Sequence, residues 1–117
     1  MARLSRPVHW IKPALKDFLA FPLSAQERLK FALGLAAEGA KADIAKPLRG
    51  LGSGVFEIAL AFGGNAFRVV YILQVDDAVW VIHAFQKKST QGIRTPRHEM
   101  RLVADRIRAL RRMTQGN

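Results

Sequence analysis

Four charged residues in or beside apolar segments could act together on a phosphate group. Arg68 lies inside an apolar segment, and Lys87 and Lys88 directly follow another. The planar guanidinium of an arginine fits two phosphate oxygens, whereas a lysine supplies a point charge. Glu57 lies in a third apolar segment, where it is either a general base or the ion-pair partner of Arg68. The pattern therefore indicates phosphate chemistry or a structural ion pair, provided that the three segments are neighbours.

The three apolar segments are predicted to be consecutive antiparallel strands of one sheet. They cover residues 55–62, 66–75 and 78–86. The turns between them are Gly63-Gly64-Asn65 and Asp76-Asp77. Turns this short connect antiparallel neighbours, so the charged residues of the three strands are expected to lie close together.

A helical hairpin is predicted before the strands. A short strand at Val8–Ile11 is followed by a helix over Pro13–Phe21 and a second helix over Ser24–Gly39. Ser24 and Glu27 have the spacing of a capping box at the start of the second helix. The apolar face of that helix is predicted to consist of Leu29, Ala32, Leu33 and Ala36, widened by Phe31 and Leu35.

The last predicted helix, over Pro96–Arg112, is amphipathic and strongly basic. Thr95 is expected to cap it, and Met100, Val103, Ala104 and Ile107 form an apolar stripe at helical spacing. Residues 40–54, which contain Lys46 and Arg49, are predicted to be a loop. The whole chain, residues 1–117, is expected to be one domain with the order β-α-α-β-β-β-α. This order predicts an α+β fold in which a helical hairpin packs on an antiparallel sheet.

The charge of the chain is large and local. The net charge is +10 over 117 residues, and residues 87–112 hold nine of the nineteen Lys and Arg but two of the nine acids. This pattern favours a polyanionic partner such as nucleic acid. The absence of cysteine excludes zinc–thiolate sites and thiol catalysis, and the three histidines are scattered, so no metal and no cofactor is expected. No apolar run is long enough to span a membrane and no signal peptide is evident, so we expect a cytoplasmic protein without a membrane partner.

Three segments of the chain resemble the HigB-like branch of the RelE/ParE toxin superfamily, the toxins of type II toxin–antitoxin pairs of bacteria and phages. They are KPLRGLGSGVFEIAL (46–60), GGNAFRVVYIL (63–73) and VIHAFQKKSTQGIRTPRHEM (81–100). The resemblance covers nearly the whole chain. It implies a compact RelE-like RNase that cleaves messenger RNA at the ribosome without metal and is neutralised by a helix-turn-helix antitoxin.

The resemblance implies roles for the charged residues. Arg68 is the expected phosphate clamp, with Glu57 as base or partner. Lys87 and Lys88 point to opposite faces if the strand continues through them, and Lys88 matches the family's cation at the strand end. Contacts to the RNA backbone are expected from Lys46, Arg49, Arg94, Arg97 and Arg101.

Some observations favour other interpretations. His83 and Tyr71 share the apolar pattern of their strands and are interpreted as core residues. Many relatives have a basic residue where this chain has Ala59, which removes a phosphate contact. The alternative function is therefore a binding protein on the same scaffold without RNase activity, such as a gyrase poison or a degenerate phage relative. A DNA-binding repressor is less favoured, because the apolar stripe of the last helix must pack on the protein body.

Overall fold

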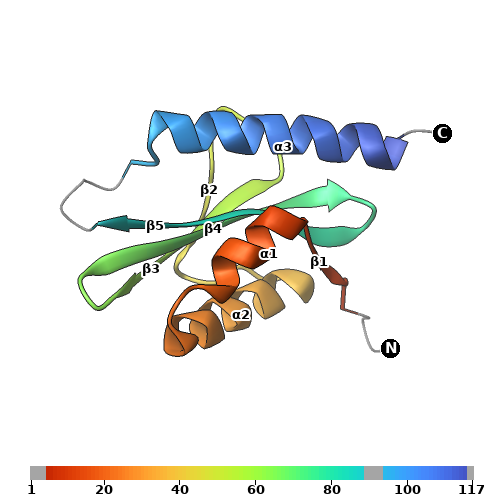
Figure 1. Cartoon of the computed structure of the whole chain (residues 1–117). Coiled ribbons are helices and arrows are strands. Elements are labelled where there is room, and N and C mark those ends of the chain that lie inside the picture. Colours follow the sequence, from red (N-terminus) through yellow and green to blue (C-terminus); the bar gives the residue numbers. More distant parts are fainter. Residues whose placement is uncertain (1–4, 89–93, 116–117) are drawn as a thin grey trace.

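The computed structural model describes residues 5–88 and 94–115. These residues form three helices and five strands (Figure 1). In order they are β1 (Val8–Trp10), α1 (Lys12–Leu19), α2 (Leu23–Ala37), β2 (Ala45–Pro47), β3 (Val55–Phe62), β4 (Asn65–Val75), β5 (Ala78–Lys88) and α3 (Arg97–Gln115). The predicted α+β class and element order are confirmed, with β2 as an addition inside the segment that was predicted to be a loop.

The strands form one sheet in the order β1-β5-β4-β3-β2. β1 pairs parallel with β5, and the other neighbouring strands pair antiparallel. The two hairpin turns adopt positive φ angles at Gly63 and Gly64 and at Asp76 and Asp77. Paired positive φ values suit the right-handed twist of a tight hairpin, which is why these short turns connect neighbouring strands.

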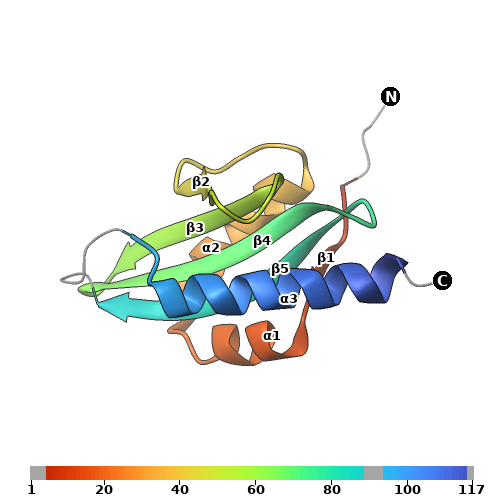
Figure 2. The ribbon, with the colours of Figure 1, turned by 90° about the horizontal axis from the view of Figure 1, so that it is seen from above.

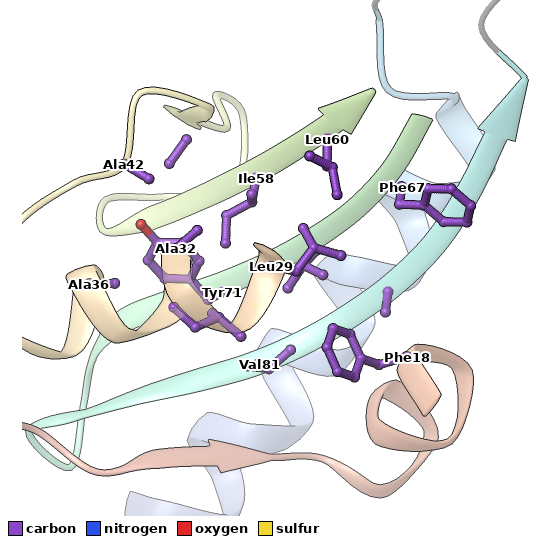
Figure 3. Close-up of a cluster of buried hydrophobic side chains, with 14 of the residues drawn as sticks. Phe18, Leu29, Ala32, Ala36, Ala42, Ile58, Leu60, Phe67, Tyr71 and Val81 are labelled. Atoms are coloured by element: carbon purple, nitrogen blue, oxygen red, sulfur yellow. The ribbon is translucent and has the colours of Figure 1, made fainter. Parts of the chain in front are cut away.

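Helices cover both faces of the sheet (Figures 1 and 2). α3 lies across one face, and the α1–α2 hairpin lies on the other. Under the hairpin, side chains of the two helices and the central strands form one apolar cluster, including Phe18, Leu29, Ile58 and Tyr71 (Figure 3). Under α3, a second cluster includes Val70, Val103 and Ile107. No helix in the described part of the chain is long and apolar enough to cross a membrane.

Two details of the predicted second helix are wrong. α2 begins at Leu23 after Pro22, and no side chain caps its first turn, so the expected capping box of Ser24 and Glu27 does not form. Phe31 does not widen the apolar face, because it is 71% exposed. The end was predicted correctly: Gly39 has a φ of 86° and closes the helix with Ala40 through hydrogen bonds to the last turn.

A bulge in β5 determines which side chains face α3. Val70 pairs with His83 whereas Tyr71 pairs with Val81, so Ile82 is an extra residue in the ladder. As a result His83 does not share a face with Val81, although the strict alternation of side chains along a strand would put residues 81 and 83 on the same face. Val81 packs under the hairpin, while His83 is buried on the α3 side.

Candidate functional site

Arg68 and Glu57 form a buried ion pair on the α3 face of the sheet. Their strands pair so that Glu57 lies opposite Val70, diagonally across from Arg68. Arg68 Nη1 donates to Glu57 Oε1 at 3.1 Å, and the two side chains are 6% and 11% exposed. The predicted partnership of these residues is therefore present. Arg68 itself is covered by the pair, so it does not meet solvent in this conformation.

Thr95 joins this pair from the start of α3. Its hydroxyl donates to Glu57 Oε2 at 2.9 Å and accepts from Arg68 Nη1 at 3.4 Å. Sequence reasoning assigned Thr95 to a helix cap and missed this role. No local sequence pattern signals this role, because the contact joins residues that are 38 positions apart in the chain. Both oxygens of Glu57 are thus held, which fixes the orientation of its carboxylate.

Lys87 is the lysine that belongs to this site. It is 4% exposed and donates from Nζ to the backbone oxygen of Arg94 at 2.6 Å. Burial lowers the pKa of Lys87 below its ordinary value, the nearby Arg68 lowers it further, and Glu57 opposes both. Lys88 is exposed on the opposite face of the strand. The register pairs Arg68 with Phe85 and so puts Lys87, and not Lys88, on the face of Arg68; the functional preference for Lys88 that the resemblance suggested stays a prediction.

A basic groove opens above Glu57 and Thr95. Its volume is about 830 Å³, and it lies between the β2 segment and the first turn of α3. Four of the five cations expected to bind RNA line it, and all four are exposed: Lys46, Arg49, Arg94 and Arg97. Arg101 is exposed on α3 but lies outside this lining. Among the residues described here, Glu57 is the one acid that lines the groove.

Two other predictions concern residues near the site. Ala59 pairs directly with Arg68 across the strands, so the position where relatives carry a basic residue supplies no charge here. His83 is buried as predicted, but it is hydrogen bonded rather than simply packed. Its Nε2 lies 2.6 Å from Glu99 Oε1, and Arg106 Nη1 donates to its Nδ1 at 3.0 Å. The histidine therefore connects β5 to α3 outside the groove.

The arrangement can perform two kinds of chemistry. The exposed cations can hold a polyanion in the groove, because phosphates pair with arginine and lysine side chains. The carboxylate of Glu57, which lines the groove, can act as a base, and the buried ammonium of Lys87 can act as an acid. Arg68 adds a positive charge next to both. All of these features are chemically compatible with a phosphodiester.

The sheet with α3 on one face and a helical hairpin on the other is that of the RelE-like toxins. A mutant of Escherichia coli toxin RelE in the free state is similar over 92% of this chain and 99% of that chain, with a TM-score of 0.62 and 19% identity. The RelBE2 toxin–antitoxin complex of Mycobacterium tuberculosis is similar over 74% of this chain and 95% of the matched chain, with a TM-score of 0.47 and 23% identity.

The sequence of the chain matches a known protein family. Residues 16–108 match the family described as "Phage derived protein Gp49-like (DUF891)", so the chain belongs to this family. No curated protein sequence matches the chain. The RelE-like fold is the fold that the resemblance to the RelE/ParE superfamily implied.

Proposed function

We propose that this protein is the toxin of a type II toxin–antitoxin pair and an endoribonuclease that cleaves messenger RNA at the ribosome. The observation that carries the proposal is the groove, in which exposed cations surround the fixed carboxylate of Glu57 while Arg68 and Lys87 lie next to it. The RelE-like fold supports the same function, because the compared RelE structure is described as that of a toxin. A helix-turn-helix antitoxin is the proposed partner, and the cytoplasm is the proposed location.

The proposed reaction needs only groups of the protein and the RNA. Glu57 accepts the proton of a ribose 2′-hydroxyl, whose oxygen then forms a bond to the adjacent phosphorus. The bond from phosphorus to the 5′-oxygen breaks, and this oxygen takes a proton from Lys87. The products are a 2′,3′-cyclic phosphate and a free 5′-hydroxyl, so atoms and protons balance.

Arg68 has a second role in this scheme. Before the reaction its charge is compensated by Glu57 at 3.1 Å. When Glu57 takes up the proton it becomes neutral, and the charge of Arg68 is then available to the negative equatorial oxygens of the transition state. Removing one preorganised hydrogen-bond donor to a developing oxyanion costs about 3 kcal/mol in other enzymes.

Neighbouring lysines provide a matched test of the chemistry. In a translation extract with a reporter messenger RNA, cleavage is mapped by primer extension for Lys87→Ala and Lys88→Ala. We expect Lys87→Ala to slow cleavage at least 100-fold and Lys88→Ala to leave it within about twofold, because one general acid contributes 10²–10⁴-fold. Equal activity of the two variants would remove Lys87 from the mechanism.

The groove is tested separately through salt dependence. Lys46, Arg49 and Arg97 are replaced together by Gln, and the control replaces three exposed cations outside the groove, Lys16, Lys30 and Arg112. Each phosphate contact releases about one counterion, so the groove variant should reduce the slope of ribosome association against salt by about 2–3. An equal reduction in the control variant would show that net charge, and not the groove, governs the association.

The alternative function is a binding protein without RNase activity. The observation that favours it is the closed ion pair beneath the groove together with Ala59 opposite Arg68, which leaves fewer free cations at the reacting phosphate. This alternative predicts growth arrest on induction without any cleavage of messenger RNA. It also predicts that arrest survives Lys87→Ala, which the nuclease proposal forbids.

A further inference from the structure

A second hollow lies at the other end of α3, and its walls are apolar. Its volume is about 420 Å³. We call it the Trp80 hollow, and define it by Trp10, Trp80, Ala109, Leu110 and Met113. Met113 is 78% exposed at its rim, although a methionine of this kind is normally covered. An apolar hollow of this size is large enough to receive a side chain of a partner protein.

The walls of the hollow are held in place by their neighbours. Trp80 contacts the ring of His9 with centroids 4.9 Å apart, and Trp10 contacts Phe18 at 4.7 Å. The Arg106 guanidinium, at one side, donates to the backbone oxygen of Ile82, the residue of the β5 bulge. The hollow therefore exists before any partner binds, which reduces the entropy lost on binding.

The Trp80 hollow is separate from the basic groove. The groove is lined by the first turn of α3, including Arg97 and Met100, whereas the hollow is lined by residues of its C-terminal half. The other wall of the hollow includes Trp10 of β1 and Lys12 at the start of α1. The two linings share no residue. A partner that occupies the hollow is therefore not required to displace RNA from the groove.

The charges around the hollow indicate the chemistry of its occupant. Lys12 and Arg106 line it, and among the residues described no acid does. The whole chain has a net charge of +10, so an acidic partner is attracted to this surface and a second copy of the chain is repelled. The walls are mainly aliphatic and aromatic and offer few hydrogen-bonding groups to read a nucleobase. An acidic, amphipathic protein segment fits these features better than either alternative.

We propose that the Trp80 hollow docks a large apolar side chain on an acidic amphipathic helix of the antitoxin. This inference rests on the proposed function, because that function supplies the partner. Carboxylates flanking the inserted side chain pair with Lys12 and Arg106, in the manner of a helix that lays its apolar face into a groove. The antitoxin then anchors to α3 away from the groove, and its bulk keeps the protein from the ribosome.

The two tryptophans of the chain make this proposal directly measurable. Both tryptophans line the hollow, so their fluorescence reports its occupation. The probe is the protein encoded by the adjacent reading frame, with any tryptophan of its own replaced by Phe. We expect a change in tryptophan fluorescence on titration into the full chain. We also expect Met113→Glu and Lys12→Glu each to weaken binding at least tenfold.

A matched control lies on the opposite side of the molecule. Phe31 is exposed on α2 and lines another hollow, so Phe31→Glu introduces the same charge at an equally exposed apolar residue. We expect this variant to bind as the parent does. Loss of binding with Phe31→Glu but not with Met113→Glu would place the partner on α2 and overturn the proposal.

Other occupants give different results. Sedimentation of the free chain would show a dimer that Met113→Glu dissolves if a second copy fills the hollow, and this result overturns the proposal. Quenching of tryptophan fluorescence by an RNA oligonucleotide, if Met113→Glu abolishes it, would show that the hollow binds nucleic acid and would also overturn the proposal.

The proposed function can fail independently of this inference. In that case the parent chain would not cleave messenger RNA, whatever the antitoxin titration shows. Met113→Glu without antitoxin should cleave as the parent does.

Discussion

The buried pair of Arg68 and Glu57 leads to a prediction about stability that the site alone does not suggest. We consider Glu57→Met, Arg68→Met and the double variant. Methionine is chosen because it is unbranched and adapts to the space that either side chain leaves. If the pair is as desolvated as its 6% and 11% exposure indicates, each single change leaves an uncompensated charge in the protein.

The two single variants should lose different amounts of stability. Glu57→Met leaves an arginine that cannot lose its proton, so we expect a loss of about 3–5 kcal/mol. Arg68→Met leaves a carboxylate that can take up a proton. Protonating a glutamate of ordinary pKa 4.3 costs about 3.7 kcal/mol at pH 7 and about 1 kcal/mol at pH 5, and this limits the part of the loss that comes from the buried charge.

The double variant should recover most of this stability. Replacing both members of a buried ion pair by apolar residues is often neutral, or stabilising by about 1–4 kcal/mol. Arg68 Nε strengthens the expectation, since it is buried and has no hydrogen-bond partner among the described residues. The structure therefore predicts that the fold tolerates both charges together or neither of them, and that either charge alone destabilises it.

Urea unfolding at pH 7 and pH 5 measures these differences as shifts in the midpoint at constant slope. The Arg68→Met loss should shrink at pH 5, where proton uptake is easier, and the Glu57→Met loss should not. A Glu57→Met loss below about 1 kcal/mol would contradict the reasoning, because losses of that size are typical of solvent-exposed pairs. A double variant as unstable as the worse single variant would also contradict it.

Three further predictions concern pH and the backbone. Burial raises the pKa of Tyr71 to about 12, above its unfolded value, so stability should fall by about 2–3 kcal/mol as pH rises from 10 to 12, and Tyr71→Phe should remove this fall in alkaline urea titrations. Burial lowers the pKa of Lys87 below its unfolded value, so the cost of burying its charge is full at low pH and stability should rise as pH approaches 10.5; Lys87→Met should flatten that rise. Gly39→Ala forces an alanine into a φ of 86° and should lower stability by about 1 kcal/mol, measured by thermal unfolding.

The parts of the fold that follow from local patterns were predictable. β3 has the predicted bounds, and β4 and β5 differ by one or two residues at their ends, because short turns and apolar runs determine them. The sheet contains two further connections that local patterns do not reveal. β2 has three residues and ends in Pro47, too short for a periodic signal, and the parallel pairing of β1 with β5 joins residues far apart in sequence.

The site residues were predictable in type, whereas their arrangement was not. Arg68 and Glu57 could be paired from the sequence because a charge inside an apolar strand needs a partner. The choice between Lys87 and Lys88 depends on register, and the sequence does not specify the register of β5 because its bulge at Ile82 shifts the alternation of side chains. Thr95 joins the site only because α3 folds back across the sheet, a tertiary contact that no local spacing encodes.

Variants of the ion pair can also distinguish a structural role of the two residues from a catalytic role. A buried ion pair is weak evidence for stability, so its retention calls for another reason. If that reason is RNA cleavage, the double Met variant should be folded and as stable as the parent, yet should leave a reporter messenger RNA intact in the translation extract. A single inactive Arg68 variant cannot show this, because misfolding would also inactivate it. A stable double variant that still cleaves messenger RNA would reduce the pair to a structural contact and exclude both residues from the mechanism.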